Sequence, residues 1–251
     1  MFPELGSIGP FTFYAFGLMA ALALVLPCWF MSQDLRDRGM EPGRALELIF
    51  AAGLGGFVGA RVYYVLENPD RGGGIFSGSG LVWYGGLIGG VIGVAALSWW
   101  RRLPLGVVAN LAAPALALGY AIGRFGCQLA GDGDYGTRSD LPWAMSYPDG
   151  TVPTSHTVQP TPLYEITAML AVFWLLWRLR GRLTAPWSLF GLYCVLSGVE
   201  RFLVEFIRRN PSEVLGLTAP QLFSVALVAV GIGLLAWTWP PAVTRRPLAR
   251  T

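Results

Sequence analysis

Charged residues are scarce in this chain of 251 residues, and lysine is absent altogether. Only 13% of the residues are charged, whereas 54% are hydrophobic and the mean hydropathy is +0.52. A soluble domain typically uses about 25% charged residues, which cover its surface. The composition therefore argues against an ordinary soluble domain and favours a membrane protein.

Cysteine and histidine are also rare. Cys28, Cys127 and Cys194 are odd in number, lie far apart, and each stands in or beside an apolar segment. This pattern argues against a disulfide framework or a zinc site, and we expect neither a metal nor a cofactor. The one histidine, His156, falls in a polar loop, where a solvated side chain is more common than one that transfers protons.

Long apolar segments are what the chain has in abundance. Each is about 18 to 22 residues long, enough for a helix to cross ~30 Å of hydrocarbon. The sequence therefore predicts an all-α, polytopic membrane protein with about seven transmembrane helices, and residues 1–251 are expected to form a single membrane-embedded domain. The long polar loop at 130–161 is predicted to form a small extracytoplasmic cap. The predicted spans lie near 12–31, 46–66, 81–100, 107–129, 162–178, 187–207 and 219–239.

The distribution of the 18 arginines orients the predicted helices, because cytoplasmic loops of membrane proteins carry the excess of positive charge. Eleven fall on one side: Arg36, Arg38, Arg44, Arg101, Arg102, Arg178, Arg180, Arg182, Arg245, Arg246 and Arg250. Four fall on the other side: Arg71, Arg138, Arg208 and Arg209. This predicts an N-terminus outside and a C-terminus in the cytoplasm. The net charge of +3 is then a topology signal with attraction to membrane lipids, and no nucleic-acid partner is expected.

Glycines repeat at four-residue spacing in two of the predicted helices, at Gly55 and Gly59 and again at Gly85, Gly89 and Gly93. Small residues at this spacing allow helix backbones to approach closely in lipid. These glycines are therefore interpreted as a packing surface.

Three arginines, Arg61, Arg124 and Arg201, lie within or at the rim of the predicted spans, where each costs on the order of 2.5 to 3.5 kcal/mol. Arg201 has Glu205 one turn away, so an intrahelical ion pair is one explanation. Arg61 has Glu67 nearby and could likewise form a structural pair. The other explanation is functional: a guanidinium binds a phosphate through two hydrogen bonds, and two such groups would hold a phospholipid headgroup.

Arg124 favours the functional explanation, because its own predicted span contains no acid. It stands in the stretch GRFGCQLAGDGDYG, whose nearest carboxylates are Asp132 and Asp134. Snorkelling of the side chain to the interface is the alternative. Cys127, three residues further on, is either a packing residue or a thiol activated by this arginine.

Further polar residues cluster at the predicted outer ends of the spans. They are Trp83 with Tyr84, and Gln159, Tyr164 and Glu165 in the segment VQPTPLYE. The aromatic residues could be interfacial anchors, and Glu165 could be an acid at a helix N-terminus. Their position at the same predicted membrane side as Arg124 raises the case for a shared site.

The order and spacing of these motifs resemble the bacterial prolipoprotein diacylglyceryl transferase family. The resemblance runs through SIGPFTFYAFGLM, FAAGLGGFVGARVYYVLE, YGGLIGG, APALALGYAIGRFG, PWAMSYP, PTPLYE, GVERFLVEFIRR and QLFSVALVAVG, almost the whole chain. It implies a seven-helix enzyme of the bacterial inner membrane. Such an enzyme moves the diacylglyceryl group of phosphatidylglycerol onto the lipobox cysteine of a preprolipoprotein and releases glycerol phosphate. The implied partners are phosphatidylglycerol, the lipobox peptide and membrane lipids.

The resemblance also implies site residues. The family's glycine–arginine signature corresponds to Gly123 and Arg124, its second essential arginine to Arg201, the paired acid to Glu205, and the arginine of the second span to Arg61. Several positions depart from the family pattern. Tyr84 and Gln159 replace histidines, Cys127 and Ala130 replace asparagines, Asp132 replaces a glutamate, and Ser197 replaces a tyrosine.

The predicted roles follow from these matches and departures. Arg124 and Arg201 are expected to be catalytic through the phosphate, with Tyr84 orienting the lipid by a hydrogen bond. Substrate binding is expected to involve Arg61, Gly123, Cys127, Asp132, Gln159, Tyr164, Glu165 and Glu205. A catalytically silent phospholipid-binding paralogue is the alternative function, and a transporter is a weaker one because no inverted repeat is visible.

Overall fold

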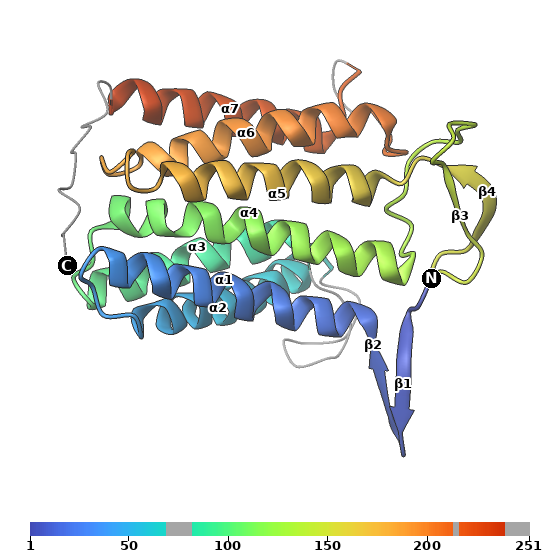
Figure 1. Cartoon of the computed structure of the whole chain (residues 1–251), viewed down its shortest axis with the longest axis horizontal. Helices are drawn as coiled ribbons and strands as arrows, with labels where there is room; N and C mark the ends of the chain where they lie inside the picture. The colour runs from blue at the N-terminus through green and yellow to red at the C-terminus, as the bar shows by residue number, and fades with distance from the viewer. Residues whose placement is uncertain (69–81, 213–215, 239–251) are drawn as a thin grey trace, which may run out of the picture. The chain divides into compact units, whose positions relative to one another are not determined.

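The computed structural model describes residues 1–68, 82–212 and 216–238, and within them each predicted span contains one α-helix (Figure 1). Six of these helices are long and apolar enough to cross a membrane, and α6 continues into a 3₁₀ turn, η1 (Glu205–Ile207). The predicted all-α, polytopic membrane fold is thereby confirmed. The helices are α1 (Ala15–Asp37), α2 (Arg44–Glu67), α3 (Trp83–Trp100), α4 (Leu105–Ala130), α5 (Thr161–Leu179), α6 (Ser188–Val204) and α7 (Ala219–Trp237).

The chain divides into two compact units. The first contains Met1–Pro27 and Ala109–Thr251, and the second contains Cys28–Val108. The single domain expected over residues 1–251 stays a prediction. Arg71, Arg245, Arg246 and Arg250, which contributed to the predicted orientation, lie outside the described residues.

Two short β-hairpins were not predicted. Strands β1 (Glu4–Ile8) and β2 (Phe11–Tyr14) are antiparallel, with Ser7 opposite Thr12, and Gly9 supplies the positive φ of +61° that their tight connection requires. Strands β3 (Met145–Tyr147) and β4 (Thr154–Val158) pair within the predicted cap (Figure 1). Strands of three to five residues carry too little alternation for the sequence to indicate them.

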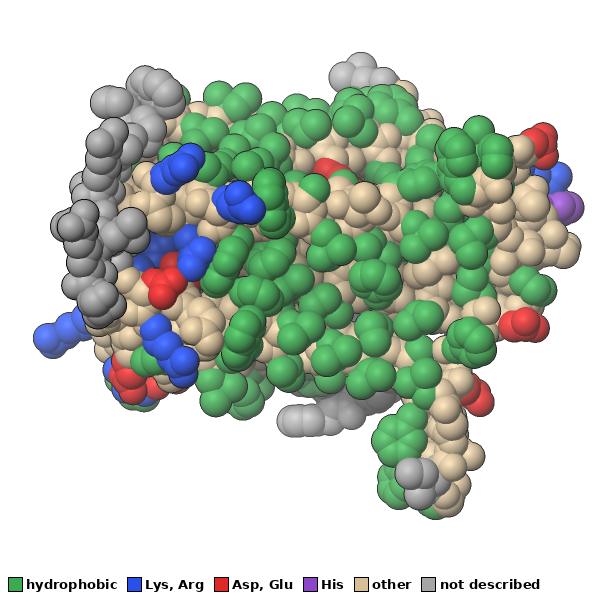
Figure 2. All heavy atoms as spheres, in the orientation of Figure 1, with side chains coloured by type: hydrophobic (Ala, Val, Ile, Leu, Met, Phe, Trp, Pro, Cys, Tyr) green, Lys and Arg blue, Asp and Glu red, His purple; other side chains and the backbone are tan. Residues whose placement is uncertain are grey.

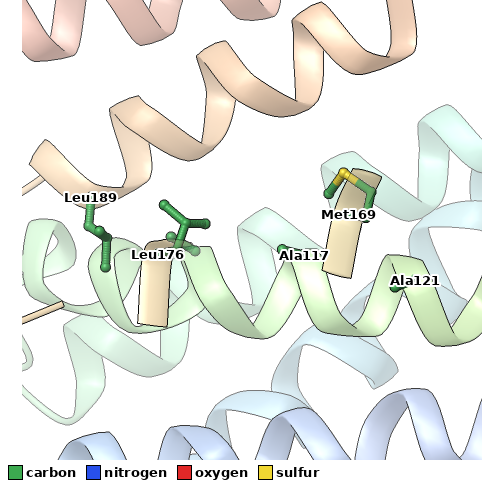
Figure 3. Close-up of a cluster of buried hydrophobic side chains, with 6 residues drawn as sticks. Ala117, Ala121, Met169, Leu176 and Leu189 are labelled. Carbon is green, nitrogen blue, oxygen red and sulfur yellow. The ribbon is translucent and has the colours of Figure 1, made fainter. Parts of the chain in front are cut away.

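The core of the first unit lies between α4, α5 and α6. Ala113, Ala117 and Ala121 recur every four residues on one face of α4 and are fully buried. Met169 and Leu176 of α5, with Leu189 at the start of α6, pack against this face (Figure 3). Small residues on α4 let the longer side chains of its neighbours fill the space, so these three helices are held side by side.

A buried asparagine connects α4 to the beginning of α6. The Asn110 amide donates to the carbonyl oxygen of Ala185 at 2.8 Å, and its Oδ1 accepts the backbone N–H groups of Leu189 and Phe190 at 3.0 and 3.2 Å. The first N–H groups of a helix have no partner inside the helix. Asn110 therefore satisfies these donors of α6 from a neighbouring helix.

In the second unit, α2 and α3 pack through the predicted glycines. A Cβ added to Gly89 would collide with the carbonyl oxygen of Gly55 and lie 2.8 Å from Gly59 Cα, and one added to Gly55 would lie 3.2 Å from Gly93 Cα. Gly59 and Gly85 face each other's backbones in the same way. The predicted packing role of these glycines is confirmed.

Hydrophobic side chains cover the middle of the helices on the face shown in Figure 2, and charged side chains gather towards the helix ends. Leu170 and Trp174 of α5, Val199 of α6 and Val225 of α7 are among the exposed apolar residues. An exposed apolar surface of this kind is expected where lipid, and not water, surrounds the helices.

Candidate active site

Arg124 lies in the last two turns of α4 and reaches the two segments that follow it in the chain. Its Nη1 binds the carboxylate of Asp134 in the cap, and its Nε lies 3.0 Å from Oε2 of Glu165, in the second turn of α5. Its Nη2 also donates to the Tyr120 hydroxyl at 3.2 Å, one turn earlier on α4. The sequence offers Asp132 and Asp134 as the nearest carboxylates, and the structure pairs Arg124 with Asp134; the sequence does not predict the pairing with Glu165 across helices.

Arg201, near the end of α6, meets the same glutamate. Its Nη1 donates to Glu165 Oε1 at 2.9 Å, and its Nη2 lies 3.0 Å from Glu205 Oε2. The intrahelical pair with Glu205 is therefore confirmed, and a second pair joins α6 to α5. Arg124 and Arg201 are thus brought together by opposite oxygens of one carboxylate.

Arg208 joins this cluster from the residues after η1. It binds Asp134, and its nitrogens lie 3.7 Å from Glu165 Oε2 and 3.7 Å from Glu205 Oε2. From the sequence alone, Arg208 is predicted to lie on the outer side of the membrane, in a loop. The signal was available in the spacing, because Arg201, Glu205 and Arg208 follow one another at i, i+4 and i+7 and so share one helical face.

The resulting arginine cluster, Arg124, Arg201 and Arg208 with Asp134, Glu165 and Glu205, contains three cationic and three anionic side chains. Glu165 is the central member, since it contacts all three arginines and also accepts the Tyr120 hydroxyl at 2.8 Å. Its side chain is fully buried, while those of Arg124 and Arg201 keep 15% and 21% of their area exposed. The carboxylates thus offset the cost of burying the arginines, and part of the side chains of Arg124 and Arg201 remains accessible.

Asp134 ties the cap to these arginines. Burial raises the pKa of its carboxyl, but the charges of Arg124 and Arg208 lower it by more, so the pKa lies below the usual value. The Thr161 hydroxyl, at the start of α5, donates to the Asp134 carbonyl oxygen. The loop is therefore anchored at both the side chain and the backbone of this residue.

Aromatic and amide groups hold the rest of the cap. Tyr135 and Tyr147 stack with ring centroids 4.9 Å apart, and the Tyr147 hydroxyl donates to Gln128 Oε1 at 3.1 Å. Burial raises the pKa of Tyr147, so its hydroxyl stays protonated as a donor. The backbone of Gln159 pairs with that of Gly136 at 2.8 Å. These contacts fix the path of the chain from α4 through the cap to α5.

Other predicted site residues of the first unit lie close to the arginine cluster. Cys127 Sγ is 3.8 Å from Arg124 Nη1, and Asp132 accepts the backbone N–H of Asp134 at 3.3 Å. The Trp143 indole N–H donates a hydrogen bond to the Tyr164 hydroxyl at 2.6 Å. Gly123 is partly buried and has open space beside its Cα.

Arg61 and Tyr84 belong to the second unit. Arg61 is buried in α2, with its guanidinium carbon 5.3 Å from the ring centroid of Tyr64. Tyr84 is 41% exposed in the first turn of α3, and its ring packs edge-on against Trp83. Their participation in a site with Arg124 stays a prediction.

Cys127, Asp132 and Asp134 also bring three potential metal-ligand atoms within 4.8 Å of one another. Two arginines already bind the Asp134 carboxylate, however, and a cation would have to displace them. We therefore assign no metal to these residues.

The cluster gathers three guanidinium groups, from the end of α4, from the end of α6 and from the residue after η1, and guanidinium groups bind phosphates through paired hydrogen bonds. A family model described as "Prolipoprotein diacylglyceryl transferase" matches residues 3–237. The chain belongs to this family.

Curated relatives named phosphatidylglycerol–prolipoprotein diacylglyceryl transferase share its sequence over most of its length. The protein of Leptospira interrogans is 30% identical over 86% of this chain and 76% of the relative. That of Chromohalobacter salexigens is 33% identical over 92% of this chain and 90% of the relative, and that of Frankia alni is 36% identical over 96% and 66%.

Proposed function

We propose that this protein transfers the diacylglyceryl group of phosphatidylglycerol to the lipobox cysteine thiol of a preprolipoprotein. Family membership supports the reaction, and the names of the relatives give the lipid and the class of protein acceptor. The observation that carries the proposal to particular residues is the convergence of Arg124 and Arg201 on the two oxygens of Glu165.

In this proposal the exposed edges of Arg124 and Arg201 hold the phosphate of the lipid. The carboxylates of the cluster already fix both guanidinium groups, so less side-chain freedom is lost when the lipid binds. As the thiolate sulfur attacks C3 of the glyceryl group, the C3–O bond breaks and its electron pair remains on the departing glycerol phosphate. The two arginines stabilise this developing negative charge.

The remaining predicted residues take supporting roles in the proposal. Glu165 and Glu205 position the arginines, and Gly123 leaves space beside them. Cys127, Asp132, Gln159 and Tyr164 line the approach from the cap, while Arg61 and Tyr84 contact the lipid from the second unit. The two units would then act as a single membrane-embedded domain.

We place the protein in the bacterial inner membrane, with its N-terminus outside and its C-terminus in the cytoplasm. The excess of arginines on one side supports this orientation. The cap and the arginine cluster then face the outer leaflet, where a lipobox cysteine at the membrane surface can reach them.

The test is one assay with purified protein, phosphatidylglycerol vesicles and a lipobox peptide, read by mass spectrometry for the diacylglyceryl thioether. Arg124→Lys should lower the rate by ~10²–10³-fold, because a point charge does not replace the paired donors of a guanidinium. Arg44→Lys is the matched control, since Arg44 pairs with Glu47 at a partly exposed position in the second unit. Unchanged turnover in Arg124→Lys would refute the phosphate role.

The same assay separates the alternatives. Lipid binding by the wild-type protein without any thioether would select a silent phospholipid-binding paralogue. Solute flux through vesicles, with neither binding nor product, would select a transporter.

A further inference from the structure

A groove lies between α5 and α6, close to the arginine cluster. Its volume is about 370 Å³, and most of its wall is apolar, including Ala168 of α5 and Leu196, Val199 and Leu203 of α6. Two polar side chains interrupt this wall, Tyr164 and Glu200. Figure 2 shows acidic side-chain atoms within the otherwise hydrophobic face over α6.

Glu200 differs from the other acids near the groove. Its carboxylate forms no ion pair with any residue that the structure describes, and its buried Oε1 accepts no hydrogen bond from them. Oε2 of Glu165 and Oε2 of Glu205 also accept no hydrogen bond, but each lies 3.0 Å from an arginine nitrogen. An unpaired carboxylate in an apolar wall is costly to the fold, so a functional reason for it is expected.

The transfer needs a group that takes the proton of the acceptor thiol, and the chain offers few candidates. His156 lies exposed on β4 and is the only histidine of the sequence. Asp134, Glu165 and Glu205 are each bound by arginines, which occupy the carboxylate oxygens that would have to meet the thiol. The carboxylate of Glu200 forms no ion pair with a described residue, and the residue lines a groove with space for a substrate segment.

The surroundings of Glu200 suit a thiol that must become a thiolate. The arginines beside it attract the negative sulfur, and the apolar wall can accommodate apolar residues that flank the acceptor cysteine. The charged or titratable groups within electrostatic range of Glu200 are Arg124, Arg201, Arg208, Glu165, Tyr120 and Tyr193.

We propose that Glu200 is the proton acceptor for the acceptor cysteine, an inference that rests on the transfer proposed above. The proton passes from sulfur to the Glu200 carboxylate, and the thiolate sulfur forms a bond to C3 of the glyceryl group. The C3–O bond breaks, with its electron pair going to the phosphate oxygen. Glu200 then returns the proton to the released glycerol phosphate, so that the carboxylate is regenerated.

Glu200→Gln tests this role, because it keeps the shape of the side chain but cannot accept the proton. It removes an unpaired charge, so the variant should fold at least as well as the wild-type protein. A thiol with a pKa of about 8.5 is about 3% ionised at pH 7. We therefore expect the rate of thioether formation at pH 7 to fall at least ~30-fold, and to recover about tenfold per pH unit up to the thiol pKa. Binding of phosphatidylglycerol should not change.

A lipobox peptide with selenocysteine in place of cysteine sharpens the test, because a selenol is already ionised at neutral pH. Glu200→Gln should lose activity with the cysteine peptide but stay within about threefold of wild type with the selenocysteine peptide. Glu200→Asp, which keeps a carboxylate, should restore part of the activity with cysteine. Glu47→Gln, an acid paired with arginines in the second unit, should match wild type with both peptides.

Two results would overturn the inference while leaving the transfer itself intact. One is a wild-type rate for Glu200→Gln with the cysteine peptide at pH 7. The other is an equal loss with both peptides at every pH, which would indicate a packing role for the side chain. Absence of the thioether from the wild-type reaction would instead refute the proposed function, and this inference with it.

Discussion

Replacing Glu165 by glutamine tests the central contact of the arginine cluster. The substitution keeps the size of the side chain and removes its charge, so Arg124 and Arg201 lose the carboxylate that joins them at 3.0 and 2.9 Å. Breaking a buried ion pair by removing one partner costs about 3–5 kcal/mol. Arg124 retains Asp134 and Arg201 retains Glu205, so we expect a loss near the lower limit, about 3 kcal/mol.

The measurement is the thermal midpoint of the purified protein in detergent. For a chain of this size, 1 kcal/mol corresponds to about 2–4 °C, so the midpoint should fall by about 6–12 °C. Glu47→Gln is a matched control because Glu47 also contacts two arginines, Arg44 at 3.0 Å and Arg101 at 2.9 Å, but its side chain is 32% exposed. Exposed pairs contribute about 0–1 kcal/mol, so the control should shift by at most about 4 °C.

The effect of added phosphatidylglycerol on the thermal midpoint is a second measurement on the same variant. Without Glu165 the cluster has one positive charge in excess, and a lipid phosphate can compensate for it. Added lipid should therefore raise the midpoint of Glu165→Gln more than that of the wild-type protein. If Glu165→Gln and Glu47→Gln melted within 2 °C of each other, the reasoning that makes Glu165 the central residue would be wrong.

Two further predictions concern the cap. The pKa of Asp134 is depressed in the folded protein, so its stabilising effect is present above the unfolded value of about 3.9 and is lost as the pH falls through the folded value. Below pH 4 the thermal midpoint of the wild-type protein should accordingly fall more steeply with pH than that of Asp134→Asn, and parallel curves would contradict the assignment. A cysteine introduced at Ser139, in a background without the native cysteines, should react with an impermeant maleimide from outside intact cells. Labelling only from the cytoplasmic side would reverse the proposed orientation.

The helices were predictable from the sequence because the features that define a membrane helix and its contacts lie within short stretches of the chain. A span must be apolar over about 20 residues, and a helix contact in lipid must use small residues at regular spacing. The segments around α1 to α5 and around α7, and the glycines Gly55, Gly59, Gly85 and Gly89, meet these requirements without reference to the rest of the chain. The same local reasoning predicted the pair of Arg201 and Glu205, which are one turn apart on one helix.

The composition of the arginine cluster was less predictable, because its contacts join distant segments. Glu165 was predicted to be a site residue, but its position near the start of a helix is equally consistent with an acid that the helix dipole favours there. Only the packing of α4, α5 and α6 around Ala117 and Met169 shows that it faces both arginines. The two hairpins were missed for a different reason, since their pairing depends on turns and not on a long periodic pattern.

The distinction between Glu165 and Glu200 follows from what each carboxylate contacts. Glu165 stabilises the buried arginines because its two oxygens contact them, and its fully buried side chain leaves no oxygen free to meet a substrate thiol. Glu200 lies 35 positions later in the chain, beside Arg201, yet its carboxylate forms no ion pair with a described residue and the residue lines the groove. A site that must both hold a phosphate and deprotonate a thiol needs one carboxylate that is bound by the arginines and another that is not. No single carboxylate can meet both conditions. The loss of activity in Glu165→Gln should therefore appear with cysteine and selenocysteine peptides alike, whereas the loss in Glu200→Gln should appear with cysteine alone.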